Sequence, residues 1–213
     1  IDLHGRPLIE WSIAFAKSQP CIDGCFVSTD SPVIADIARQ CGAEVPFMRS
    51  ASLSTDTAKT SDVIIDFIRR LSIGFDDDIL LLEPTSPYRT SATFKNLLES
   101  YRQFRGKKAV SVTEAVSSSY IFQYSVDFEA RPVLRNVNDC IDSNGVRRQD
   151  IKKSYYLDGS FYMSRVAEFI EDPAFVNKDT IAVLSDYFSS FEIDCENDLE
   201  LMRAIFKSIG SPF

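Results

Sequence analysis

The sequence predicts an α/β fold with a mostly parallel sheet, and three observations support that prediction. Over the first half of the 213 residues, short apolar runs alternate with amphipathic stretches of helical spacing. Such alternation is typical of strand–helix–strand units with right-handed crossovers. Apolar residues make up 45% of the chain, which is enough for one sizeable core. The chain has no repeats and no low-complexity tract, so residues 1–213 are expected to form a single domain.

Four elements are predicted in the first 50 residues. Residues 7–19 carry apolar side chains at helical spacing, and the proline that opens them fits a first helical turn, where its missing N–H costs nothing. Residues 25–28 predict a short strand. A helix is predicted over 33–41. Asp30 or Ser31 can cap its start, and Gly42 is expected to end it. Residues 43–47 predict a second, weaker strand.

The remainder of the chain continues the alternation. Helices are predicted over 60–71, 91–104 and about 196–208, and strands over 78–82, 108–113, 155–163 and 189–194. The helix over 60–71 is strongly amphipathic. The run DILLL at 78–82 is continuously apolar, as expected for a strand that is buried on both faces. Acidic residues open the last helix, where the helix dipole favours them.

The segment from about 117 to 150 departs from this pattern. Alternating residues and turn-forming Asn, Asp and Gly predict hairpins that are inserted into the main domain. One interpretation is a surface excursion. The other is a dimerisation arm, because a lone hairpin is marginally stable and its exposed edges favour pairing.

Composition excludes several classes of function. The net charge of −8 argues against a broad basic face for nucleic acid. His4 is the one histidine, so zinc sites with several histidines are excluded. The five cysteines form no CxxC pair, which favours a reducing, cytoplasmic location over a disulfide scaffold. The sequence has no apolar run of 18 residues and no signal-peptide pattern, so no membrane partner is expected.

Two carboxylates are the first candidate for chemistry. On a strand, Glu192 and Asp194 would point to one face, at the end where parallel sheets bind ligands. Hard oxygen ligands without histidine or cysteine suit Mg²⁺. The alternative is a solvated strand end, with Asp194 as a helix N-cap.

Three further segments carry polar groups that could bind a ligand. The turn EPTSP at 83–87 is stiffened by two prolines and offers hydroxyl groups, although a hydroxyl there could instead cap the next helix. Arg147 and Arg148 could grip a carboxylate or phosphate, or be solvated. In the aromatic strand YYLDGSFY, core packing is the default, and Gly159 could admit a ligand to the backbone.

The order of these motifs resembles that of a known family. GRPLIEW, VSTD, AEVPFMRSASLSTDTA, LLLEPTSPYRT, RRQD, YYLDGSFY and FEIDCENDLEL together are similar to the acylneuraminate cytidylyltransferases, which make CMP-sialic acids and related CMP-nonulosonates. The resemblance implies a nucleotidyltransferase (nucleotide-diphospho-sugar transferase) fold, a Rossmann-like three-layer sandwich with a hairpin dimerisation arm. It also implies a homodimer, CTP and a nonulosonic (sialic-type) acid as substrates, Mg²⁺ as cofactor, and pyrophosphate as product.

The resemblance also implies roles for individual residues. The acidic pair of the family falls on Glu192 and Asp194, as catalytic residues and metal ligands. The nucleotide-binding positions fall on Arg49, Ala58 and Thr60. The substrate-binding positions fall on Glu83, Thr85, Ser86, Arg148, Asp158, Tyr162 and, as an aromatic lent by the partner subunit, Phe175.

Three positions depart from the family pattern. Glu83 replaces a glutamine, Asp158 an asparagine, and Glu192 an aspartate. Because the first two lie in the sugar half of the site, a legionaminate-like acceptor is as consistent with the sequence as N-acetylneuraminate. Two alternatives stay open: a cytidylyltransferase for the eight-carbon sugar Kdo or another sugar, and an inactive binding protein on the same fold.

The opening residues IDLHGRPLIEW raise a further expectation. The resemblance implies a buried strand and a phosphate-binding loop before this segment, and neither is present in the 213 residues. A chain without them is expected to bind CTP poorly and to be inactive.

Overall fold

The computed structural model describes residues 1–115, 124–125, 135–136 and 152–210. Its main sheet has the order β3-β7-β4-β8, with strands β3 (Asp78–Leu81), β7 (Tyr155–Arg165), β4 (Lys108–Glu114) and β8 (Ile181–Leu184). β7 runs antiparallel to both of its neighbours, whereas β4 and β8 are parallel. The sheet is therefore mixed: β3, β4 and β8 run in one direction, as expected of a mostly parallel sheet, and β7 alone among these four strands runs the other way.

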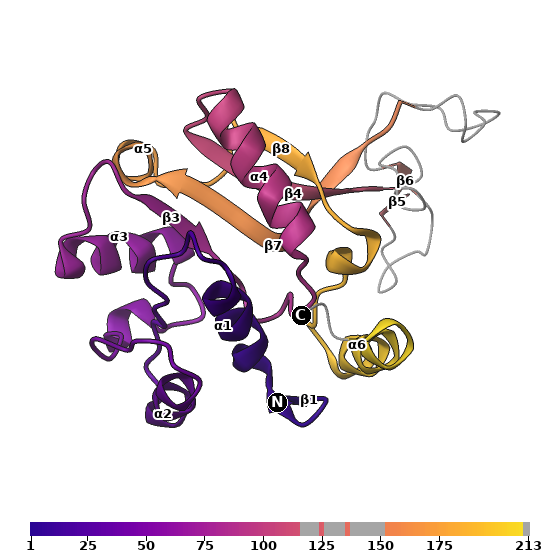
Figure 1. Cartoon of the computed structure of the whole chain (residues 1–213), viewed down its shortest axis with the longest axis horizontal. Coiled ribbons are helices and arrows are strands. Elements are labelled where there is room, and N and C mark those ends of the chain that lie inside the picture. Colours follow the sequence, from indigo (N-terminus) through magenta and orange to yellow (C-terminus); the bar gives the residue numbers. More distant parts are fainter. Residues whose placement is uncertain (116–123, 126–134, 137–151, 211–213) are drawn as a thin grey trace.

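Helices cover the sheet on both faces (Figure 1). On one face, α1 (Leu8–Ser18) and α4 (Ser91–Gln103) contribute Phe15 and Phe94 to a core shared with Phe161 of β7. On the other, α3 (Thr60–Leu71) and α5 (Val166–Glu171) pack around Ile79 of β3. Leu80, the next residue of β3, joins the first cluster, so successive side chains face opposite layers. The three-layer α/β prediction is confirmed.

The chain ends pack together beside this sandwich. A short hairpin, β1 (Asp2–Leu3) and β2 (Arg6–Pro7), lies against α6 (Glu196–Ile209). Leu3, Trp11, Met202 and Phe206 belong to one buried cluster. Further along, Ile13 of α1 packs against Ala35 and Ala38 of α2 (Pro32–Gln40). None of the helices in the described ranges has the length and apolar character to cross a membrane.

Several predicted boundaries agree closely with the structure. The helix predicted over 60–71 is Thr60–Leu71, and Ser31 caps α2 by accepting a hydrogen bond from the Ile34 N–H. Gly42 follows α2 with φ +86°, the left-handed conformation that suits a glycine after a helix. β3 is half-buried rather than buried on both faces.

Three strand predictions need correction. The segments at 25–28 and 43–47 meet only in a parallel bridge between Phe26 and Glu44. The segment 189–194 is not a strand. A 3₁₀ turn (Tyr187–Ser190) is followed by an extended stretch, which makes one backbone hydrogen bond to a distant segment of the same chain, from the Ile193 N–H to the Thr85 carbonyl at 2.8 Å. β8 and α5 were not predicted, since four to six residues give little periodicity.

The predicted arm at 117–150 lies almost wholly outside the described residues. Within it, β5 (Tyr124–Ser125) and β6 (Arg135–Asn136) pair antiparallel, which agrees with the predicted hairpin.

Candidate active site

A fully buried arginine ties together the segments around the polar turn that follows β3. Arg89 donates from Nε to the Ser160 carbonyl at 2.7 Å, and from its two terminal nitrogens to Ser12 Oγ at 2.9 Å and to the Glu83 carbonyl at 2.6 Å. The side chain has no exposed surface. α1, the turn and β7 are therefore fixed to one guanidinium, whose planar fork makes all three bonds directional.

Burial of this cation is compensated by acidic neighbours. Loss of hydration lowers the pKa of Arg89 to about 9, while the charges of Glu83, Asp158 and Glu192 oppose that shift. At neutral pH the guanidinium thus stays charged, and it makes a concentration of carboxylates possible on this side of the sheet.

The extended stretch at 192–194 is pinned at both ends. Its bond to Thr85 joins it to the EPTSP turn, and Asp198 accepts from the backbone N–H groups of Asp194 and Cys195, at 3.1 and 2.9 Å. Ile193 points into the core, so Glu192 and Asp194 lie on the opposite side of the stretch. The N-cap of α6 is Cys195, not Asp194.

Glu192 lies directly against a glycine of β7. A Cβ at Gly159 would overlap with Glu192 Oε1, and Gly159 has φ +70°, which side chains rarely adopt. Ser86 donates a hydrogen bond to the same Oε1 at 3.3 Å. The hydroxyl of the turn therefore binds the acid and does not cap α4, whose N-cap is Thr90.

Asp158 is enclosed by donors of its own chain. Its carboxylate accepts from Ser111 at 2.5 Å, from Thr113 at 3.3 Å, from the Ser160 N–H at 3.0 Å and from Ser185. The side chain is 1% exposed. These contacts fix the backbone of β7 at Gly159 beside Glu192, and the sugar-binding role expected for Asp158 stays a prediction.

Burial and neighbouring acidic side chains raise the pKa of Glu192 and of Glu83. For Glu192, burial is the main cause and the charges of Glu83 and Asp194 add to it. For Glu83, burial raises the pKa, Arg89 lowers it, and Asp194 raises it. Such a group of carboxylates gains from a bound cation.

The donor set fits Mg²⁺, which takes one or two carboxylates and then phosphate oxygens. In the described part of the chain, no group of three or more acidic, histidine or cysteine side chains is placed to hold a metal ion, so a complete protein cage is not present there. Glu192 and Asp194 are the residues that could hold the ion.

A cavity of about 270 Å³ brings four of the expected site residues together. Its lining consists of Thr60, Leu81, Glu83, Tyr162, Ala174, Phe175 and Val176. Burial and the charges of Glu83, Glu192 and Asp158 raise the pKa of Tyr162 to about 12, so its hydroxyl keeps its proton at neutral pH. The Phe175 ring lies 5.6 Å from that of Tyr162 in the same chain.

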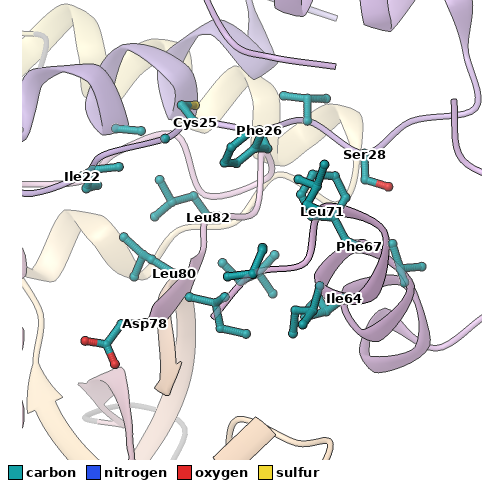
Figure 2. Close-up of a pocket in the computed structure, with 18 of the residues that line it drawn as sticks. Ile22, Cys25, Phe26, Ser28, Ile64, Phe67, Leu71, Asp78, Leu80 and Leu82 are labelled. Carbon is teal, nitrogen blue, oxygen red and sulfur yellow. The ribbon is translucent and has the colours of Figure 1, made fainter. Parts of the chain in front are cut away.

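A larger trough of about 1200 Å³ adjoins this cavity and shares Thr60, Leu81, Glu83 and Phe175 with it. Figure 2 shows Leu80 and Leu82 on one side of the trough, Cys25 and Phe26 on another, and Ile64 and Phe67 of α3 beside them. Apolar side chains of this kind, contributed by a strand and the segments beside it, are typical of the interior of an α/β domain. One part of the trough, which we call its polar end, is lined by Arg49, Ser54, Thr55 and Thr60, and these supply a cation and hydroxyl groups that a nucleotide can bind.

The expected nucleotide-binding residues lie at that polar end. Arg49, Ala58 and Thr60 all line the trough. Arg49 donates to Ser54 Oγ at 3.1 Å and to Asp30 at 3.3 Å, which orients its guanidinium from a half-buried position.

Two residues stand apart from the rest of the predicted set. Arg148 lies outside the described residues. Thr85 contributes its backbone carbonyl to the 192–194 stretch, and its side chain is half-buried. Sequence reasoning missed Arg89, although it ends the EPTSPYR motif, because nothing in the sequence distinguishes a buried arginine from a solvated one.

The cytidylyltransferase family model matches residues 1–130. The chain is 32% identical to the CMP-N,N'-diacetyllegionaminic acid synthase of Legionella pneumophila, over 96% of this chain and 87% of that protein. It is 28% identical to an N-acylneuraminate cytidylyltransferase of Streptococcus agalactiae, over 92% of this chain and 46% of that protein. A solved CMP:2-keto-3-deoxy-manno-octonic acid synthetase complexed with CTP has a TM-score of 0.67 and 14% identity, over 97% of this chain and 90% of that one.

The acid group generates a testable pH dependence. The pKa of Glu192 is raised above its ordinary 4.5, so the folded state binds this proton more tightly than the unfolded chain. The free energy of unfolding therefore loses this contribution as pH rises above 4.5. We expect Glu192→Gln to raise Tm by about 1–3 °C at neutral pH, with the gain disappearing toward pH 4.5. Thermal unfolding across this pH range checks it, with the exposed Glu44→Gln as control. A loss of Tm at neutral pH would contradict it.

Proposed function

The chain belongs to the cytidylyltransferase family, and from this premise we propose that it transfers CMP from CTP to the anomeric hydroxyl of a nonulosonic acid, with release of pyrophosphate. It is a nucleotidyltransferase enzyme. The observation that carries the acceptor class is the 32% identity to a CMP-N,N'-diacetyllegionaminic acid synthase, which extends over 96% of this chain.

The geometry supports a division of labour between the two hollows. CTP is bound at the polar end of the trough, by Arg49, Ala58 and Thr60. The acceptor occupies the adjoining cavity, against Glu83, Tyr162 and Phe175, and Arg148 pairs with its carboxylate. Because the hollows share Thr60 and Glu83, the two substrates meet where they join.

Glu192 and Asp194 hold Mg²⁺ in this proposal. When bound, the ion neutralises charge on the CTP phosphates and on the leaving pyrophosphate. Ser86 and Gly159 fix the Glu192 carboxylate, and Asp198 fixes the backbone at Asp194. The protein's own contribution is therefore mainly positioning, which is a large part of catalysis in phosphoryl-type transfers.

We also propose a homodimer that acts in the cytoplasm. Exposed apolar side chains gather at the start of β7, the end of β8 and the turn that follows β8, and their exposed fractions range from 43% to 63%: Tyr155, Tyr156, Leu157, Leu184 and Tyr187. Apolar surface of this kind favours a second copy of the chain. The free cysteines of the described residues fit a reducing compartment.

The test of the proposed function is pyrophosphate release by the full natural protein that contains these residues. We expect Mg²⁺-dependent release that requires both CTP and a nonulosonic acid, within a panel of N,N'-diacetyllegionaminic acid, N-acetylneuraminate and Kdo. Asp194→Asn should lower kcat by about two orders of magnitude, while the exposed Asp36→Asn changes it little.

Other outcomes would select the alternatives. Turnover with Kdo alone would identify an eight-carbon acceptor. Calorimetric binding of CTP without turnover, even at high Mg²⁺, would indicate a binding protein. Wild-type activity in Asp194→Asn would remove this residue from the reaction.

Glu83 should read the acceptor. Glu83 lines the cavity proposed for the sugar. Its carboxylate can only accept hydrogen bonds, whereas the amide of a glutamine would both donate and accept them. We expect Glu83→Gln to change the ratio of kcat/KM between two nonulosonic acids by about tenfold, since the change alters one hydrogen-bond pattern. The KM for CTP should change less than twofold, roughly. An unchanged acceptor ratio would show that Glu83 does not contact the sugar.

A further inference from the structure

A second buried cation lies outside the site described above. Lys108, the first residue of β4, is 2% exposed, and its ammonium group donates to the Asp172 carbonyl at 2.7 Å and to Asp172 Oδ2 at 2.6 Å. Asp172 ends α5 and begins the loop that leads to β8. The buried ammonium group therefore binds the first residue of this loop.

Stability alone does not explain this arrangement. Placing a charge inside a protein is costly, and a buried ion pair can often be replaced by apolar residues without loss of stability. An ion pair differs from an apolar contact in that it fixes the orientation of the groups that it joins. This pair therefore holds the loop in one position.

Hydrogen bonds within the loop connect Asp172 to the residues that follow it. The Asp172 carboxylate also accepts from the Asn177 side chain at 3.0 Å. The Asn177 N–H donates to Thr180 Oγ1 at 2.8 Å, and Thr180 Oγ1 donates to the Phe175 carbonyl at 3.2 Å. Lys108 is thus connected to the backbone of Phe175 through a continuous set of polar contacts.

Phe175 and its neighbours form one wall of the acceptor cavity. Three of the seven lining residues, Ala174, Phe175 and Val176, come from this loop. The Phe175 ring lies 4.9 Å from that of Phe169 and 5.6 Å from that of Tyr162. A shift of the loop would therefore change the part of the cavity that these three residues line, whereas Arg49 and Ala58 of the trough belong to a different segment of the chain.

We infer that Lys108, acting through Asp172 and Asn177, is a positioning residue that sets the Phe175 wall of the acceptor cavity. The inference rests on the proposed function, because it assigns that cavity to the acceptor. Lys108 touches neither hollow and is not a catalytic residue.

The discriminating variant is Lys108→Met, which removes the ammonium group and leaves the half-exposed Asp172 to water. We expect the KM for the acceptor to rise about tenfold, while kcat and the KM for CTP stay within about twofold, as when only ground-state binding is lost. The acceptor is the nonulosonic acid of the panel that the wild-type protein uses best.

The neighbouring Lys107→Met is the matched control. Lys107 pairs with Glu168 of α5 at 2.8 Å but is 65% exposed, so its loss breaks an ion pair on the same helix without releasing the loop. It should leave all three constants unchanged. If Lys108→Met fails to fold, Asn177→Ala tests the same connection further along and should raise the acceptor KM by about threefold. A KM for CTP that rises as much as that for the acceptor would overturn the inference.

A second readout separates this inference from the proposed function. Hydrogen exchange at the amides of Ala174, Asn177 and Thr180 should accelerate in Lys108→Met and not in Lys107→Met. Unchanged exchange overturns the inference by itself. If the wild-type protein turns over no acceptor, the proposed function fails, and with it the assignment of this wall to an acceptor.

Discussion

The Arg89 guanidinium fixes three segments that are distant in the sequence: α1 through Ser12, the turn through Glu83, and β7 through Ser160. Its burial is tolerable because the charges of Glu83, Asp158 and Glu192 oppose the effect of lost hydration, and their concentration is tolerable because it is charged. Each half of this arrangement depends on the other. The site therefore depends on one buried cation, whose charge offsets the charges of the nearby carboxylates.

The backbone of β7 brings that unit into contact with the hollows. Phe161 and Met163 enter the core beneath α1 and α4, so the intervening Tyr162 faces the acceptor cavity. The lack of a side chain at Gly159 lets Glu192 lie against the backbone of β7, and the enclosed Asp158 fixes that backbone. One strand thus contributes to the core, to the support of Glu192 and to a wall of the site. The loop anchored by Lys108 supplies the facing wall.

The sequence predicted the parts of this protein that have local causes. Amphipathic spacing defined α3 to the residue, and the motif order led to Glu83, Tyr162 and Phe175, which the structure places around one cavity. The direction of β7 was not predictable, because it depends on where the chain returns to the sheet. The roles of Arg89 and Lys108 were also hidden, since burial of a cation depends on contacts 64 to 77 positions away in the chain. Sequence patterns reflect interactions between residues that are close along the chain, whereas Arg89 and Lys108 bind residues that are distant along it.

The measurement that tests this account most directly is kcat for CMP transfer by Arg89→Lys, with Tm recorded beside it. Lysine keeps the positive charge but lacks the planar fork that bonds three segments at once. We expect a folded protein with a lower Tm and a kcat reduced by about two orders of magnitude, because the segments that position the acidic side chains are no longer fixed to one another. A kcat equal to that of the wild-type protein would contradict it, and would leave Arg89 as a structural residue remote from the reaction.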